Sequence, residues 1–104
     1  LQLAKAMERA VLDKVSGLYN LVYSDPISKH DLLVLFNKYL MNGEISIIPD
    51  EGPHINKSLK RTNFAFNYTI PDYEKMIFDL AKWIEDHYYL YPHYDLSRKN
   101  MNLL

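Results

Sequence analysis

Lys57, Ser58 and Arg61 bring two cationic side chains and one hydroxyl into a stretch of five residues. A diphosphate requires such donors, because its charged oxygens accept hydrogen bonds from ammonium, guanidinium and hydroxyl groups. The stretch follows a turn-rich run, Pro49 to Asn56, which is typical of an exposed loop. We therefore predict that Lys57, Ser58 and Arg61 bind an anionic substrate group. The alternative is an ordinary basic loop whose charges are only hydrated.

Other polar residues are weaker candidates for chemistry. His54, His87 and His93 carry imidazoles, which are common zinc ligands. Their spacing fits no compact pair on one helix, and tyrosines intervene, so a half-buried aromatic tail is the favoured interpretation. A docking surface for another domain or a second subunit is the alternative. Asp72 and Glu74 begin a predicted helix, where negative charge complements the helix dipole, and we interpret them as capping residues. The sequence therefore predicts no metal site and no catalytic residue in this chain.

The composition is that of one globular domain. The chain has 104 residues, of which 48% are hydrophobic and 24% charged, unlike a disordered or membrane-spanning protein. The net charge of −1 supplies no basic field, so we expect no nucleic-acid partner. The lack of cysteine excludes disulfides and fits a cytoplasmic location. No apolar run has spanning length, so we expect no membrane association.

The first fifteen residues have the spacing of an amphipathic helix. Their apolar stripe comprises Leu3, Met7, Ala10 and Val11, and polar residues take the other side. We expect this stripe to be buried, and the glycine at position 17 to end the helix in a left-handed conformation. Because the chain starts inside a helix, with no capping residue, we also expect it to be a piece of a longer protein.

Two further main helices are predicted from their start signals. Ser28 should cap the first of them by accepting a hydrogen bond from the amide of Asp31, and Asn42-Gly43 should end it. The second should begin near Asp72 and fade near residue 87. A short helix is also expected over residues 59–66.

Two short apolar segments, Leu18–Tyr23 and Glu44–Ile48, are predicted to be strands. A helix lies between them, so the three elements should form a βαβ unit with parallel strands. We therefore predict an α/β fold with a short parallel sheet and about three main helices. The predicted core comprises Leu21, Val22, Leu32, Leu35, Phe36, Ile45, Ile47, Ile77 and Leu80.

Five stretches carry a resemblance through their order and spacing. They are Gly17-Leu-Tyr-Asn-Leu-Val, Asp25-Pro-Ile-Ser-Lys-His-Asp-Leu-Leu, Ile45-Ser-Ile-Ile-Pro-Asp, Asn56-Lys-Ser-Leu-Lys-Arg and Ile70-Pro-Asp-Tyr-Glu-Lys-Met-Ile. Over residues 1–85 the chain is similar to the C-terminal part of extended short-chain dehydrogenases/reductases. Within them it most resembles the NAD-dependent epimerase/dehydratase branch that includes dTDP-4-dehydrorhamnose reductases.

The resemblance implies the substrate-binding part of a two-part enzyme that acts on a nucleotide-sugar. In such enzymes an N-terminal Rossmann domain holds NAD or NADP and carries a catalytic tyrosine–lysine pair. Residues 1–87 would form the substrate-binding domain, which closes over the nucleotide-sugar, and residues 88–104 an aromatic and polar tail. The implied partners are the Rossmann domain and the substrate, with a homodimer as a further option.

The cofactor and catalytic motifs of that family are absent from this chain. Gly17, Gly43 and Gly52 are its three glycines and lie too far apart for a glycine-rich turn, and no tyrosine is followed four residues later by lysine. We expect no NAD(P) binding and no turnover by this fragment alone.

One binding position also departs from the family. Lys57 stands where the resemblance has arginine, so a point charge replaces a two-pronged donor. Loss of Arg61 should weaken substrate binding and leave stability almost unchanged. The rival hypothesis is a stand-alone α/β protein-interaction domain without catalysis.

Overall fold

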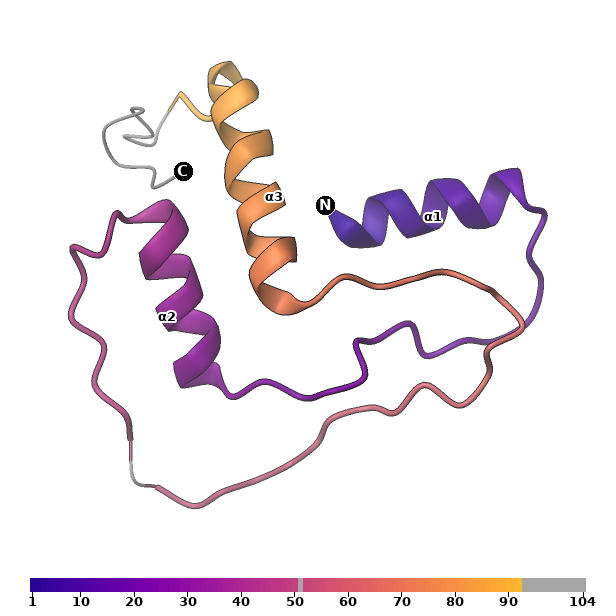
Figure 1. Cartoon of the computed structure of the whole chain (residues 1–104), viewed down its shortest axis with the longest axis horizontal. Helices are drawn as coiled ribbons and strands as arrows, with labels where there is room; N and C mark the ends of the chain where they lie inside the picture. Colours follow the sequence, from indigo (N-terminus) through magenta and orange to yellow (C-terminus); the bar gives the residue numbers. More distant parts are fainter. Residues whose placement is uncertain (51, 93–104) are drawn as a thin grey trace.

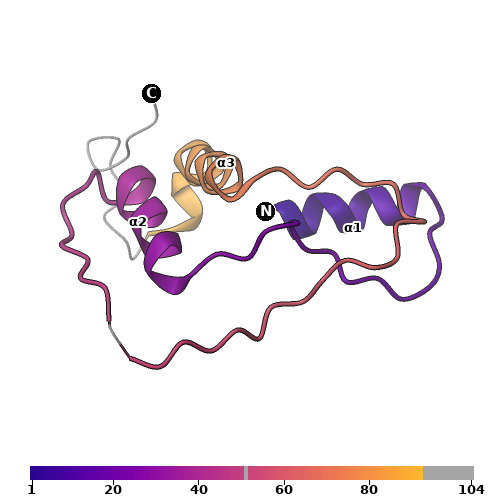
Figure 2. The ribbon, with the colours of Figure 1, turned by 60° about the horizontal axis from the view of Figure 1, so that its bottom comes forward.

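The computed structural model describes residues 1–50 and 52–92. It contains the helices α1 (Gln2–Leu12), α2 (Lys29–Leu40) and α3 (Tyr73–Asp86) and the short 3₁₀ helix η1 (Tyr88–Leu90). Helices α2 and α3 pack side by side, and α1 lies apart from them (Figure 1). Two long connections, from α1 to α2 and from α2 to α3, run as extended chain, and the stretch just before α3 passes alongside α1 (Figure 2).

The predicted α/β fold is wrong, because residues 1–50 and 52–92 contain helices and extended chain but no strand. Around the first predicted strand, residues 18–23, hydrogen bonds from side chains to the backbone link the α1–α2 connection to the α2–α3 connection. The Nδ2 amide of Asn20 donates to the carbonyl of Lys60 (3.2 Å), and that of Asn63 donates to the carbonyl of Leu18 (3.4 Å). A strand requires a ladder between backbone amides and carbonyls, and these amide side chains form none.

The second predicted strand, residues 44–48, is replaced by a contact with α2. Asn37 binds both backbone groups of Ile45: its Nδ2 donates to the carbonyl oxygen (2.6 Å), and its Oδ1 accepts from the amide (3.0 Å). A neighbouring strand makes the same pair of bonds to the residue opposite it. The side-chain amide of Asn37 therefore satisfies both backbone hydrogen-bonding groups of Ile45, so this residue needs no partner strand.

The end of α1 differs from the prediction. Lys14 has a left-handed φ of 51°, and its amide donates to the carbonyl of Val11 (3.2 Å). The amide of Val15 donates to the carbonyl of Ala10 (2.9 Å). These two bonds make a Schellman motif, whose left-handed position is usually glycine because a side chain there is strained. Gly17 also has a positive φ, 111°, but lies in the loop beyond the motif.

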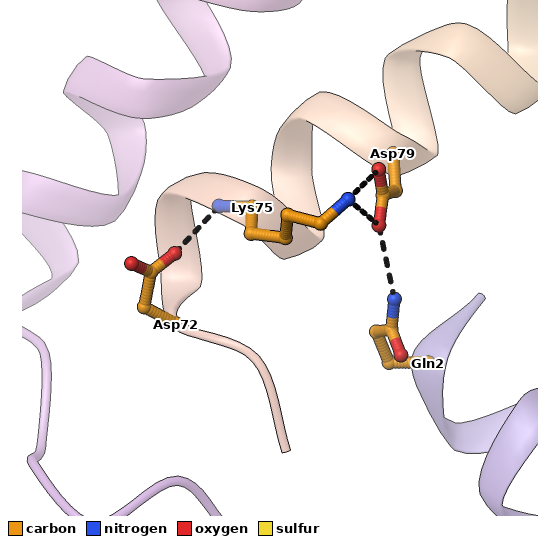
Figure 3. Close-up of polar contacts among 4 residues, drawn as sticks. All are labelled: Gln2, Asp72, Lys75 and Asp79. Carbon is orange, nitrogen blue, oxygen red and sulfur yellow. Dashed lines mark hydrogen bonds and ion pairs between the residues drawn. The ribbon is translucent and has the colours of Figure 1, made fainter. Parts of the chain in front are cut away.

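The predicted starts of α2 and α3 are confirmed. Ser28 Oγ accepts a hydrogen bond from the amide of Asp31 (3.1 Å), and Asp72 Oδ1 accepts from the amide of Lys75 (2.8 Å; Figure 3). Asn42-Gly43 ends α2 with φ angles of 53° and 73°, as expected. The helix expected over residues 59–66 is absent, and this segment is extended.

Helices α2 and α3 contact each other through rings and charges. The ring of Tyr39 meets that of Phe78 edge to face, with centroids 5.7 Å apart. The ammonium of Lys38 lies 2.8 Å from Glu74 Oε1, and the Tyr39 hydroxyl donates to the same oxygen. These two hydrogen bonds lower the pKa of Glu74, and the bond to Glu74 raises the pKa of Lys38. Both side chains are about half exposed, so water screens this ion pair and its contribution to stability is small.

A weaker polar link joins α1 to α3. Asp79 accepts from the ammonium of Lys75 one turn earlier (2.9 Å) and from the Nε2 amide of Gln2 in α1 (3.4 Å; Figure 3). The carboxylate thereby bridges a residue of its own helix and the start of another.

The core is smaller than predicted. Four apolar residues are buried in the described part of the chain, namely Ala6, Phe66, Ile77 and Ala81. Of the predicted core only Ile77 is among them; Ile45 is 47% exposed, and the other predicted positions are half-buried. The radius of gyration is 16.3 Å, against about 13 Å for a compact domain of this length. The chain does not close around one interior.

The expected burial of the apolar stripe of α1 is also wrong. Leu3, Met7 and Val11 are 67%, 61% and 76% exposed, whereas Ala6 is turned inward and buried. An exposed apolar helix face of this kind is typical of a surface that another body covers. Among the described residues, no helix has the length and apolar character needed to cross a membrane.

Candidate functional site

The predicted binding segment begins with a local turn. Asn56 Oδ1 accepts hydrogen bonds from the amide of Ser58 (3.0 Å) and from its hydroxyl (2.6 Å). This Asx turn forms because a short amide side chain reaches the backbone two residues ahead. Ser58 Oγ therefore already donates its proton, and its lone pairs remain available to a donor. The ammonium of Lys57 is exposed and has no partner among the described residues.

Arg61 is held by the backbone of its own loop. Its guanidinium donates from Nη1 to the carbonyl of Tyr68 (2.8 Å) and from Nη2 to the carbonyl of Phe66 (2.6 Å). The guanidinium also lies over the ring of Phe64, 5.1 Å from its centroid. Its Nε is buried and has no hydrogen-bond partner within the described ranges. The side chain thus braces residues 61–68, a role for which both prongs of the guanidinium are needed.

Two hollows lie beside this segment. The first, called the Arg61 hollow, has a volume of about 440 Å³, and the second, called the Ser58 hollow, one of about 230 Å³. The Arg61 hollow is lined by Val22, Tyr23, Ser24, Lys60, Arg61, Phe64, Tyr68, Thr69 and Ile70. The Ser58 hollow is lined by Val22, Tyr23, Pro26, Ile27, Ser58, Leu59 and Tyr73.

A third hollow, mainly apolar, lies between α1 and the start of α3. It has a volume of about 270 Å³. Val22 and Tyr23 line this hollow and both of the others, so the first connection forms a wall common to all three.

The three predicted binding residues do not converge on one hollow. Arg61 and Ser58 line different hollows, and Lys57 lines neither. Lys60, Ser24 and Thr69 are the polar neighbours of Arg61 in its hollow, and the sequence prediction did not include them. Lys60 was detectable as a third cation in the segment. Ser24 and Thr69 lie in other segments, and no local pattern connects them to Arg61.

The histidines show no metal geometry in the part of the chain that the structure describes. No group of three or more histidine or carboxylate side chains is placed to hold a metal ion there. His87 stacks on the ring of Trp83, with centroids 4.2 Å apart, and its Nδ1 lies 2.7 Å from the Trp83 carbonyl. His93 lies outside the described residues, as does most of the predicted tail, residues 93–104.

The carboxylates at the start of α3 are engaged in structural contacts. Asp72 caps the helix, and Glu74 binds Lys38 and Tyr39. No protein-family model, no curated protein and no solved structure matches the chain.

Proposed function

We propose that the chain is the substrate-binding part of an NAD(P)-dependent epimerase, dehydratase or reductase that acts on nucleotide-sugars. The observation that carries the proposal is the position of the segment from Asn56 to Arg61. This segment is extended on the surface, it borders the Arg61 and Ser58 hollows, and its motif resembles a substrate-contacting stretch. An exposed segment beside two hollows is accessible to a ligand and can close over it.

The charges of the segment suit a diphosphate. The ammonium groups of Lys57 and Lys60 have no partner among the described residues, and each can donate to a phosphate oxygen. Arg61 serves this function indirectly, because its guanidinium fixes the loop that follows the segment.

The partner of this substrate-binding part is a catalytic unit that holds the cofactor. Such a unit would cover the exposed face of α1, where Leu3, Met7 and Val11 are unprotected. In this proposal the Rossmann domain belongs to the same cytoplasmic enzyme, and the cofactor is NAD or NADP.

The proposal is tested by titrating the chain with dTDP-glucose and UDP-glucose while recording amide NMR spectra. Without its catalytic unit the chain should bind weakly, with a Kd of about 1 mM, which corresponds to about −4 kcal/mol. The shifted amides should lie in residues 56–61 and along the two hollows. NAD and NADP should give no saturable signal in calorimetry. Micromolar NAD(P) binding, or no response to either nucleotide-sugar, would contradict the proposal.

A second candidate is a protein-interaction unit without a nucleotide ligand. The exposed stripe of α1 favours it, because such a face can dock on any protein with a complementary groove. The same titration separates the two candidates. An interaction unit leaves every amide unshifted with nucleotide-sugars, whereas a substrate-binding part responds in the segment around Lys57.

A further inference from the structure

Within residues 1–50 and 52–92, Arg61 is a cation without a counter-ion. Its guanidinium is partly buried and donates only to the neutral carbonyls of Phe66 and Tyr68. Charges removed from water are normally paired, and here none of the side chains lining the Arg61 hollow is a carboxylate. The two carbonyls hold the charge in place but do not neutralise it. The wall of the hollow therefore carries uncompensated positive charge, which favours an anion.

Three further donors line the same hollow and have no partner in residues 1–50 and 52–92. They are the ammonium of Lys60 and the hydroxyls of Ser24 and Thr69. They come from three separate parts of the extended chain, so only the fold brings them to one place. The volume of about 440 Å³ lies within the range of small-molecule sites, roughly 300–1,000 Å³.

We infer that the Arg61 hollow is a binding site for a small phosphorylated ligand. A phosphate group presents several acceptor oxygens in different directions, which suits several donors that line one hollow. A carboxylate presents only two, in one plane. Lys60, Ser24 and Thr69 donate to these oxygens, and the fixed charge of Arg61 lies behind them. Tyr23 and Tyr68 also line the hollow, and their rings can pack against an apolar or ring-bearing part of the ligand.

This site differs from the one expected at Lys57 and Ser58, since neither residue lines the Arg61 hollow. It also stands without any nucleotide-sugar, because the phosphate can belong either to a free phosphorylated metabolite or to the diphosphate of a sugar nucleotide. The two sources share the chemistry of the site and differ in what else they contact.

The test is calorimetric titration of the chain with inorganic pyrophosphate at low salt. Lys60→Gln should raise the Kd about tenfold, because it removes a hydrogen bond from a charged ammonium group. Thr69→Val should raise the Kd about threefold, because it removes a weaker hydrogen bond from a neutral hydroxyl. Lys82→Gln is the matched control, because it removes the same charge from an exposed position of α3 outside the hollow. Its Kd should remain that of the wild type. Arg61 is left intact because it braces the loop.

Competition with dTDP-glucose identifies the source of the phosphate. Displacement of pyrophosphate by dTDP-glucose places the sugar nucleotide's diphosphate in the Arg61 hollow, whereas simultaneous binding assigns the hollow to a separate phosphorylated metabolite. Three results would overturn the inference: no binding of pyrophosphate, an unchanged Kd in Lys60→Gln, or an equal rise in Lys82→Gln. The last would show that pyrophosphate responds only to the overall charge of the chain.

Discussion

Replacing Arg61 with methionine should destabilise the chain, contrary to the expectation from sequence. Methionine keeps much of the apolar stem and removes the guanidinium, which binds the carbonyls of Phe66 and Tyr68. Hydrogen bonds from a charged donor each contribute about 1.5–3 kcal/mol, and the contact with Phe64 about 0.5–1 kcal/mol. Water can reach part of this loop, and the buried Nε also disappears with the guanidinium. We therefore expect a net loss of about 2–4 kcal/mol.

A loss of this size would be a large fraction of the total. Domains of about 100 residues have free energies of unfolding of about 5–15 kcal/mol. This chain buries few residues, and Phe66, whose carbonyl Arg61 holds, is one of them. The released loop would expose that ring as well.

Urea unfolding gives the measurement, followed by circular dichroism and by fluorescence of Trp83, the one tryptophan in the chain. Lys57→Met is the matched control, and it should change the free energy of unfolding by less than about 0.5 kcal/mol because its ammonium contacts nothing in the described part of the chain. Arg61→Lys should fall between, since one ammonium cannot reach both carbonyls with the geometry of a guanidinium. If Arg61→Met has the same urea midpoint as the wild type, the bonds from Arg61 to the carbonyls of Phe66 and Tyr68 do not stabilise the loop. The guanidinium is then available to contact substrate.

Three other predictions concern the ends and contacts of the helices. Lys14→Gly should raise the free energy of unfolding by about 1 kcal/mol, because it removes a side chain from a left-handed position. The control Lys5→Gly, inside α1, should lower the free energy of unfolding by about as much. If both variants change the free energy of unfolding in the same direction, the Schellman motif is refuted. Asn37→Ala should cost about 1–2 kcal/mol in urea unfolding through the two lost bonds to the backbone, while an unaltered midpoint would mean that residues 44–48 are held otherwise. Glu74→Gln should lower the melting temperature at neutral pH and leave it unchanged in acid. The lowered pKa of Glu74 means that its contribution is present above the ordinary carboxyl value of 4.5 and is lost as pH falls through the lower folded-state value; the same decrease at both pH values would exclude the ion pair with Lys38 as its cause.

Local signals were sufficient to predict where the three main helices lie, although they also predicted a helix over residues 59–66 that is absent. The caps at Ser28 and Asp72 and the stop at Asn42-Gly43 depend on residues within one turn of each other, and the structure confirms them. Such signals act within the segment itself, so the sequence around them carries the information. The positions of all three main helices followed from them and from the apolar spacing.

The strands and the buried faces depended on contacts that no local pattern encodes. A β-prone segment forms a strand only if another backbone pairs with it, and the amide of Asn37 met the backbone of Ile45 instead. The stripe of α1 marks an apolar face correctly, but whether Leu3 and Met7 are covered depends on what packs there.

The candidate site was likewise predictable from the sequence only in part. The sequence alone indicated a cationic segment around Lys57 and Arg61, because charge and spacing are visible in the residue order. Only the tertiary structure directed the guanidinium of Arg61 to two carbonyls and placed Ser24 and Thr69 beside it. The reason is that a donor bonds whichever acceptor the fold brings within reach, wherever that acceptor lies in the sequence. Residues 24, 61 and 69 become neighbours only when both long connections fold against each other.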